Sequence, residues 1–453
     1  MRLSNEQANA AVAAVEQAHR ARRAADPLPA WLAPLQETAL AAFGRAGFPS
    51  PRHEDWKYTN LAELAKSGGE LLNAPTPVAD RTAAAALLAR LPRRDGDLAL
   101  VIANGRFAPE LSILPKDDAS ITPITIRTLA DAQASDPQAS DAQASERVAS
   151  WIAADADDES LGLVALNAAF LQDWVTIDIA ADANLDQTIH VIFTTDGAPA
   201  GTQPRVLVTA GSNSACTVFE HHVGDGAGWT NAVTHLRLEE AAELTYIKLQ
   251  SEGPDAHHIA AQFVSTAADS RFRAAHIDLG GGLVRNDLRV RMQGRGSRID
   301  LFGLFLADGK RHIDNHTRID HLVGDTTSRE RYHGILADRG RGVFNGKIIV
   351  HEGADGTDAE LNNRNLLLSK MAEIDTKPEL EIYTDDVKCA HGATTGQLDE
   401  QALFYLRSRG VSLREAKHML VLAFARDVLE KFDAQAPELL EFTNDILERR
   451  LPE

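Results

Sequence analysis

Apolar residues at helical spacing dominate the first part of the chain. From Ser4 to about Leu91, alanine, leucine and glutamate are abundant and apolar positions recur every three or four residues, as in ETALAAFGRAGF and RTAAAALLARLP. The segment PSPRHEDWKYTNL interrupts this pattern, because its two prolines end one helix and its charges flank Trp56 and Tyr58. We therefore expect an N-terminal helical domain over residues 1–95, in which the aromatic pair anchors a loop by packing.

Residues 96–173 have a mixed pattern. Two short β-type runs, LALVIANGRF and SITPITIR, precede the segment DAQASDPQASDAQAS at positions 131–145. That segment repeats one pentapeptide three times and contains no large apolar side chain, so burial cannot offset the entropy of ordering it. We expect mixed strands and helix here, with a linker or flexible insertion at 131–145.

The pattern changes to alternation between Trp174 and Tyr383. Short runs in which β-branched and polar residues alternate, such as WVTIDI, LTYIKL and DLRVRM, recur every ten to fifteen residues and are separated by Gly, Asp and Asn. This pattern predicts an all-β core over residues 174–385. Both a sandwich and a coiled stack of parallel strands fit, since no strict short period distinguishes them.

Helical spacing returns in residues 386–453. DEQALFYLRSRG begins with acidic residues and ends with Arg and Gly410, and the next helix opens with a capping box from Ser412 to Glu415. Each helix carries an apolar stripe, which comprises Leu403, Phe404 and Leu406 on the first and Met419, Leu420, Leu422 and Phe424 on the second. The stripes either cover the end of the β domain or bind a partner protein by groove packing.

Composition and charge narrow the function classes. Forty-six Lys and Arg residues against 65 Asp and Glu give a net charge of −19, which disfavours nucleic acid and anionic membranes as partners. The longest apolar run, MLVLAFA, is far short of a bilayer span, and no signal peptide is recognisable. With only two cysteines, Cys216 and Cys389, we expect a cytoplasmic protein with free thiols. Cys216 is expected to be a core residue of a strand.

Cys389 and His391 are the strongest candidate for chemistry. In an extended strand, residues at i and i+2 project from the same face about 6 to 7 Å apart at Cα. If they bind metal, the set is incomplete, because zinc and iron–sulfur sites need about four ligands, mostly thiolates. A partner chain would then supply the others. Alternatively, Cys389 is a nucleophile with His391 as its base and Asp385 or Asp386 orienting the imidazole.

Other candidate motifs are weaker. His312, His316 and His321 lie in RHIDNHTRIDH, whose alternation favours a strand on which four residues span about 13 Å, so a shared metal is not expected. GLFLADGKR has five residues between its glycines where a P-loop has four, and Arg311 replaces the Ser or Thr that binds magnesium. If ATP takes part in the function, a partner must hydrolyse it.

Three segments resemble the SufB/SufD family of the SufBCD iron–sulfur cluster assembly complex. They are HEDWKYTNL, ELNNRNLLLS and DVKCAHGATTGQLDEQALFYLRSRGVSLREAKHMLVLAFA. EDWKYT and KCAHGAT are closer to the SufD branch, and the resemblance covers most of the chain except 131–145. It implies a mainly β fold, with a right-handed parallel β-helix core between N- and C-terminal helical domains.

The resemblance also implies a function. A member of this family is a non-catalytic scaffold that pairs with a SufB-type β-helix subunit and docks the ABC ATPase SufC through the C-terminal helices, here Leu403, Phe404, Leu406, Met419, Leu420 and Phe424. The family's interface cysteine and histidine fall on Cys389 and His391, which would share metal in a transient iron–sulfur cluster with the SufB subunit. Reduced flavin in the complex and a homodimer in isolation are further expectations.

Two rival functions remain open from the residues alone. One is a cysteine-dependent hydrolase or transferase that uses Cys389 and His391. The other is a carbohydrate-active β-helix enzyme, which would need a secretory signal in most settings.

Overall fold

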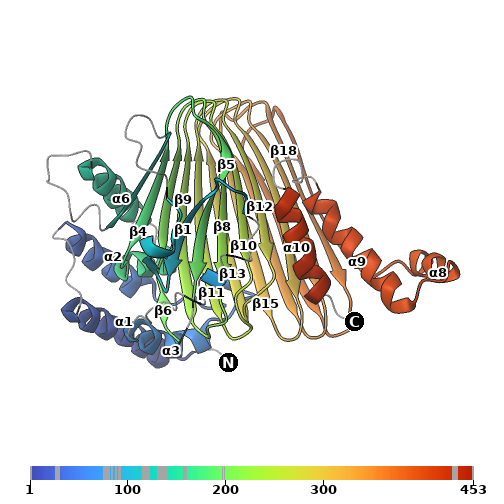
Figure 1. Ribbon diagram of the computed structural model, residues 1–453, viewed down its shortest axis with the longest axis horizontal. Coiled ribbons are helices and arrows are strands. Elements are labelled where there is room, and N and C mark those ends of the chain that lie inside the picture. The colour runs from blue at the N-terminus through green and yellow to red at the C-terminus, as the bar shows by residue number, and fades with distance from the viewer. Residues whose placement is uncertain are drawn as a thin grey trace.

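The chain forms a parallel β-helix of about eight turns, with helices at its N-terminal and C-terminal ends (Figure 1). The computed structural model describes residues 3–25, 31–74, 93–114, 123–129, 141–156, 161–195, 199–430 and 437–450, with isolated positions between 82 and 89 and at 197. The expected fold class, mainly β with flanking helical parts, is confirmed. Of the two architectures that the alternating pattern allowed, the coiled stack of parallel strands is the one observed.

Successive turns supply strands to two sheets, and the inner faces of these sheets enclose the core. Sheet A contains, in spatial order, β2 (Arg106–Phe107), β1 (Leu98–Ala103), β5 (Asn184–Thr194), β8 (Ala215–Val223), β10 (Glu243–Gln250), β12 (Arg271–Asp278), β14 (Arg298–Ala307), β16 (Thr327–Leu336), β18 (Thr357–Leu367) and β20 (Val387–Gly396). Sheet B contains β19 (Glu373–Ile382), β17 (Arg341–Val350), β15 (His312–His321), β13 (Leu283–Met292), β11 (His257–Thr266), β9 (Trp229–Leu238), β7 (Arg205–Ala210), β4 (Trp174–Ile179) and β3 (Ile124–Thr128), with β6 (Gly201–Thr202) paired to β9. The pairs β1–β2 and β3–β4 are antiparallel, and the pairs within the coil are parallel.

Alternation along the strands produces this fold. In β14, Ile299 and Leu301 face the core, while Arg298 and Asp300 lie on the outer face and form an ion pair at 2.9 Å. The two-residue period of a strand places each class of side chain on its own face. His312, His316 and His321 lie in strand β15, as their alternating context predicted.

Left-handed turn residues connect the strands at one corner of the coil. Their backbone N–H groups bond to carbonyl groups of the next turn, and they recur at intervals of 27 to 31 residues: Asp182, Asn213, Ala241, Asp269, Gly296, Asp325 and Gly356. Asp, Asn and Gly tolerate a positive φ better than other residues do. These positions therefore form a hydrogen-bonded ladder along the corner of the β-helix.

The N-terminal helices cover the outer face of the first turns of sheet B. They are α1 (Asn5–Ala25), α2 (Leu32–Ala46), the 3-10 helix η1 (Glu54–Trp56), α3 (Ala62–Asn73), α6 (Asp141–Ala156) and α7 (Gly162–Ala169). Their apolar faces share one buried cluster with Trp174 of β4 and Trp229 of β9. The helices thus bury the outer faces of these strands.

Trp56 fixes the segment after α2 to the middle of sheet B. The Arg285 guanidinium lies 4.3 Å from the centroid of the Trp56 ring, and its Nη1 donates to the Asp55 carbonyl at 2.9 Å. Nη1 also donates to Asp314 at 2.7 Å, and the Thr59 hydroxyl donates to the same carboxylate. Trp56 is buried and Tyr58 is half-buried, so the packing role predicted for this pair is confirmed for Trp56.

The C-terminal helices lie at the other end of the molecule. They are α8 (Glu400–Ser408), α9 (Leu413–Leu429) and α10 (Pro437–Arg450), and the predicted capping box at Ser412 and Glu415 is present. α9 packs Val421 and Ala425 against the outer face of sheet A, next to Leu304 and Ile335. α8 projects away from the β-helix, and none of its residues is buried (Figure 1).

The β-helix extends beyond the core boundaries expected at 173 and 385. β1 joins sheet A well before position 174, and β20 continues the coil to Gly396, because strand pairing rather than sequence order decides which residues belong to the core. Residues 141–145 of the expected insertion are the start of α6, where Ala and Gln support helix. Residues 131–140 and most of RTAAAALLARLP at 81–92 lie outside the described residues.

Candidate functional site

The last turn of the β-helix carries Cys389 and His391. Both lie on β20, which pairs with β18 on one side, and β19 likewise pairs only with β17 in the part of the chain that the structure describes. The outer edges of these two strands therefore present backbone N–H and C=O groups with no neighbouring strand. Such an edge is a template for pairing with another chain.

The strand register fixes the direction of the two side chains. Cys389 lies opposite Ala359 and His391 opposite Leu361, and both of these β18 residues face the buried core. Cys389 is half-buried and packs against that core, whereas His391 is exposed at the end of the coil. The prediction that the i and i+2 residues share one face of a strand is confirmed.

The surroundings of Cys389 do not favour a nucleophile. Burial raises the pKa of its thiol, and the nearby Asp358 carboxylate raises it further. A nucleophilic cysteine needs a lowered pKa and an imidazole in contact with its sulfur. Within the described residues, no hydrogen bond joins Cys389 to His391, nor His391 to Asp385 or Asp386. The geometry therefore argues against the hydrolase or transferase hypothesis.

As metal ligands, the two side chains would be too few for a complete site. Among the described residues, no three His, Cys, Asp or Glu side chains form a group that could hold one ion. A thiolate and an imidazole both suit iron, but a cluster generally requires about four ligands. Any cluster held at this end of the coil would need ligands from a second chain.

Apolar side chains around the last turn were not identified from the sequence. Met371, Ile382 and Tyr383 are 62%, 41% and 60% exposed, although side chains of these types are usually buried. We call these three residues, together with Cys389 and His391, the terminal-coil surface. The signal available in the sequence was EIYTDD, where apolar residues run directly into a turn.

The expected ATPase-docking residues divide into three groups. Phe404 and Met419 are exposed, and Leu403, Leu406 and Leu420 are half-buried. Phe424 instead contacts its own chain, since its ring stacks on His333 of β16 with centroids 4.6 Å apart. Phe424 faces sheet A and therefore anchors α9 to the β-helix.

Two further exposed apolar residues, Tyr405 and Leu413, lie near Phe404 and Met419 in sequence. We call these four residues the α8/α9 surface. Sequence reasoning missed Tyr405 and Leu413 because they fall beside the expected stripe rather than on it. They enlarge the exposed apolar area on the projecting helices.

Cys216 occupies a different environment. It lies on β8 within the central core, and burial raises the pKa of its thiol to about 12. Both cysteines are free, as expected, and the prediction that Cys216 is a core residue of a strand is confirmed.

Family models match nearly the whole chain. The model for the SufBD protein N-terminal region matches residues 20–191, and the model for the SUF system FeS cluster assembly SufBD core domain matches residues 192–424. Together with the β-helix and its unpaired end, these matches place the chain among iron–sulfur cluster assembly proteins.

Curated relatives agree with the family models. An iron–sulfur cluster assembly SufBD family protein of Synechocystis is 32% identical over 87% of this chain and 86% of its own length. The iron–sulfur cluster assembly protein SufD of Escherichia coli is 31% identical over 88% of both chains. The chain thus belongs to the SufBD family.

No helix in the described ranges is long and apolar enough to cross a membrane.

Proposed function

We propose that the protein is a non-catalytic scaffold subunit of an iron–sulfur cluster assembly complex, working in the cytoplasm. One observation carries the proposal. Nine large apolar side chains are exposed in the described part of the molecule, and seven of them lie on the terminal-coil surface or the α8/α9 surface. Exposed apolar patches of this kind mark protein interfaces. Two separate patches support two different partners.

The terminal-coil surface suits a second β-helix subunit of the SufB type. Its unpaired strand edges can continue the sheets into a partner, as in β-strand addition. Cys389 and His391 would then lie at the junction, where thiolates of the partner complete the ligand set. The iron–sulfur cluster is the transient cargo of this junction, and reduced flavin belongs to the complex rather than to this chain alone.

The α8/α9 surface suits an ABC ATPase of the SufC type. α8 stands clear of the β-helix, while α9 is fixed to it through Val421, Ala425 and Phe424. His333 of β16 also bonds to the Phe424 carbonyl at 3.0 Å. A displacement of α8 by the ATPase would therefore be transmitted through α9 to sheet A, whose last strand carries His391. ATP hydrolysis is assigned to the partner.

Co-purification of single-site variants from the protein's own cells tests this assignment. Phe404→Asp should lose the ATPase and keep the β-helix partner, whereas Tyr383→Asp should lose the β-helix partner and keep the ATPase. Ile113→Asp is the matched control, because Ile113 is 41% exposed and lies outside both surfaces. The proposal fails if the wild-type chain purifies with neither partner, or if all three variants retain both. A homodimer of the isolated chain would use the terminal-coil surface, so Tyr383→Asp should also convert it to a monomer.

A further inference from the structure

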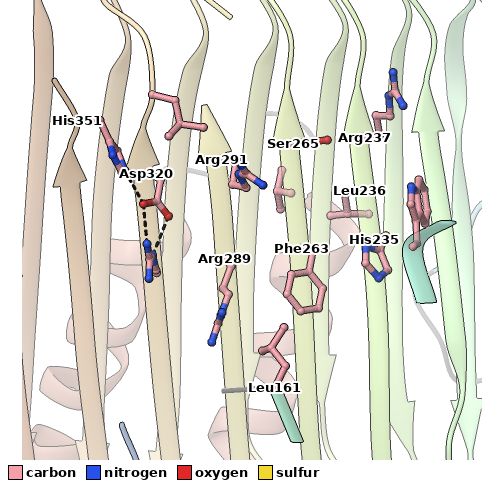
Figure 2. A pocket seen from close by; sticks show the side chains of 14 residues that line it. Leu161, His235, Leu236, Arg237, Phe263, Ser265, Arg289, Arg291, Asp320 and His351 are labelled. Carbon is pink, nitrogen blue, oxygen red and sulfur yellow. Dashed lines mark hydrogen bonds and ion pairs between the residues drawn. The ribbon is translucent and has the colours of Figure 1, made fainter. Parts of the chain in front are cut away.

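A groove lies on the outer face of sheet B. It is lined by residues of β9, β11, β13 and β15, by Trp151 of α6 and by His351, which directly follows β17, and it has a volume of about 540 Å³ (Figure 2). Small-molecule sites typically have volumes of about 300 to 1,000 Å³. The groove therefore has room for a ligand of ordinary metabolite size.

Aromatic rings form one end of the groove. The rings of Trp151 and His235 stack with centroids 4.9 Å apart, and His235 stacks on Phe263 at the same distance. His235 and Phe263 are paired in register on β9 and β11, whereas Trp151 comes from α6. The three rings thus form one continuous stack, next to the apolar side chain of Leu161. A flat ring system can extend such a stack.

Guanidinium groups form the other side of the groove. Arg289 lies in register with Phe263 and Arg318 on the neighbouring strands, and Arg291 lies two residues further along β13. Arg237 also lines the groove, and it pairs with Glu239 at 2.7 Å. The alternation of the strands directs all four guanidinium groups to the outer face.

Carboxylates balance part of this charge, since Glu239 pairs with Arg237 and Asp320 pairs with Arg318. Asp320 accepts hydrogen bonds from Arg318 Nε at 2.7 Å and from His351 Nε2 at 2.8 Å. Figure 2 shows His351 beside this carboxylate. Arg291 makes no ion pair or hydrogen bond with any described residue. The groove therefore collects positive charge on a chain whose net charge is −19. A concave site with this charge attracts anions.

We propose that this groove binds a mononucleotide, whose base stacks on the ring of Phe263 and whose phosphate binds Arg289 and Arg291. A guanidinium group donates two hydrogen bonds to two oxygens of one phosphate. An aromatic ring stacks on any nucleobase, because every base has a π-face. The net charge of the chain disfavours an extended polyanion, so the ligand is a single nucleotide rather than nucleic acid. This inference is independent of the proposed scaffold function.

Titration calorimetry on the full chain tests the site with adenosine monophosphate, guanosine monophosphate and inorganic phosphate as separate probes. We expect at least one nucleotide to bind about tenfold more tightly than inorganic phosphate, since the stacked base adds to the phosphate contact. Arg291→Ala should weaken nucleotide binding about tenfold or more, because a charged hydrogen bond is lost. Phe263→Leu keeps apolar bulk but removes the ring, and it should weaken nucleotide binding about fivefold while leaving phosphate binding unchanged.

Arg339→Ala is the matched control, because Arg339 is exposed and lies outside the groove. Thermal unfolding of each variant checks that the fold is intact. The proposal is overturned if neither nucleotide binds more tightly than phosphate, if the two groove variants bind like the wild type, or if a short single-stranded oligonucleotide binds more tightly than either nucleotide.

Discussion

Cys389 lies in register with Cys216, six strands away along sheet A and on the same row of inward-facing side chains. The row between them contains Leu244, Phe272, Ile299, Ser328 and Ala359. With strands about 4.8 Å apart, the two sulfur-bearing residues are separated by about 29 Å of filled core. Cys216 is therefore enclosed at one end of the row, whereas Cys389 lies at its open end.

This difference predicts the reactivity of the two thiols. In the isolated native chain, iodoacetamide should modify Cys389 at mildly alkaline pH, since burial raises its pKa but leaves it accessible. Cys216 should stay unmodified until the chain unfolds, because its pKa is raised to about 12 and its thiol is buried. Peptide mass spectrometry gives both rates. Equal rates in the native chain would contradict the enclosed position of Cys216, and Cys389→Ser provides the reference for its peptide.

His391→Ala should lower cluster formation by the whole complex by about tenfold or more, because a ligand or proton-transfer group is removed from the junction. The stability of the chain should change by less than about 0.5 kcal/mol, since His391 is exposed. Lys388→Ala is the matched control, because Lys388 is exposed on the opposite face of the same strand. Anaerobic reconstitution followed by absorbance spectroscopy measures the effect. Unchanged cluster formation in the His391 variant would remove this residue from the proposed site.

The sequence predicted part of this site and missed its setting. The spacing of Cys389 and His391 was enough to place both side chains on one face of a strand. Nothing local indicated that this strand is the last in its sheet, so the core was expected to end at 385 instead of Gly396. Strand order depends on pairing between residues far apart in the chain, and exposure of Tyr383 follows from that order.

The fold was likewise predicted only as far as local chemistry allowed. Alternation identified the strands, but it is the same for a sandwich and for a coil. The repeat that distinguishes them is the left-handed corner at Asp182, Asn213, Ala241, Asp269 and their later equivalents. Its residue type varies and its spacing ranges from 27 to 31 residues, because turns of the coil differ in length. A search for a strict short period therefore could not detect it.

Trp56→Ala should lower the free energy of unfolding by about 3 to 5 kcal/mol, as truncation of a buried aromatic residue leaves a cavity. It also removes the ring on which the Arg285 guanidinium lies. Chemical denaturation measures the loss, and hydrogen exchange should show faster opening of residues 50–74. Lys57→Ala, at an exposed neighbouring position, should change stability by less than about 0.5 kcal/mol. Similar stability of both variants would contradict the anchoring role of Trp56.

Glu330 should make stability depend on pH. It lies inside the coil two strands before His391 on the same row, and burial raises its pKa to about 7. Because this folded-state pKa exceeds the unfolded value, the native state binds more protons between pH 4.5 and 7. The contribution of Glu330 is therefore fully present below about pH 4.5 and is lost as pH rises through 7, by about 3 kcal/mol at most.

Glu330→Gln keeps an acceptor for Thr317, whose hydroxyl lies 2.6 Å from Glu330, but cannot ionise. Denaturation from pH 5 to 8 should show the variant gaining stability relative to wild type, whereas the exposed control Glu352→Gln should show a constant difference. A constant difference for Glu330→Gln as well would mean that Glu330 ionises normally in the folded chain.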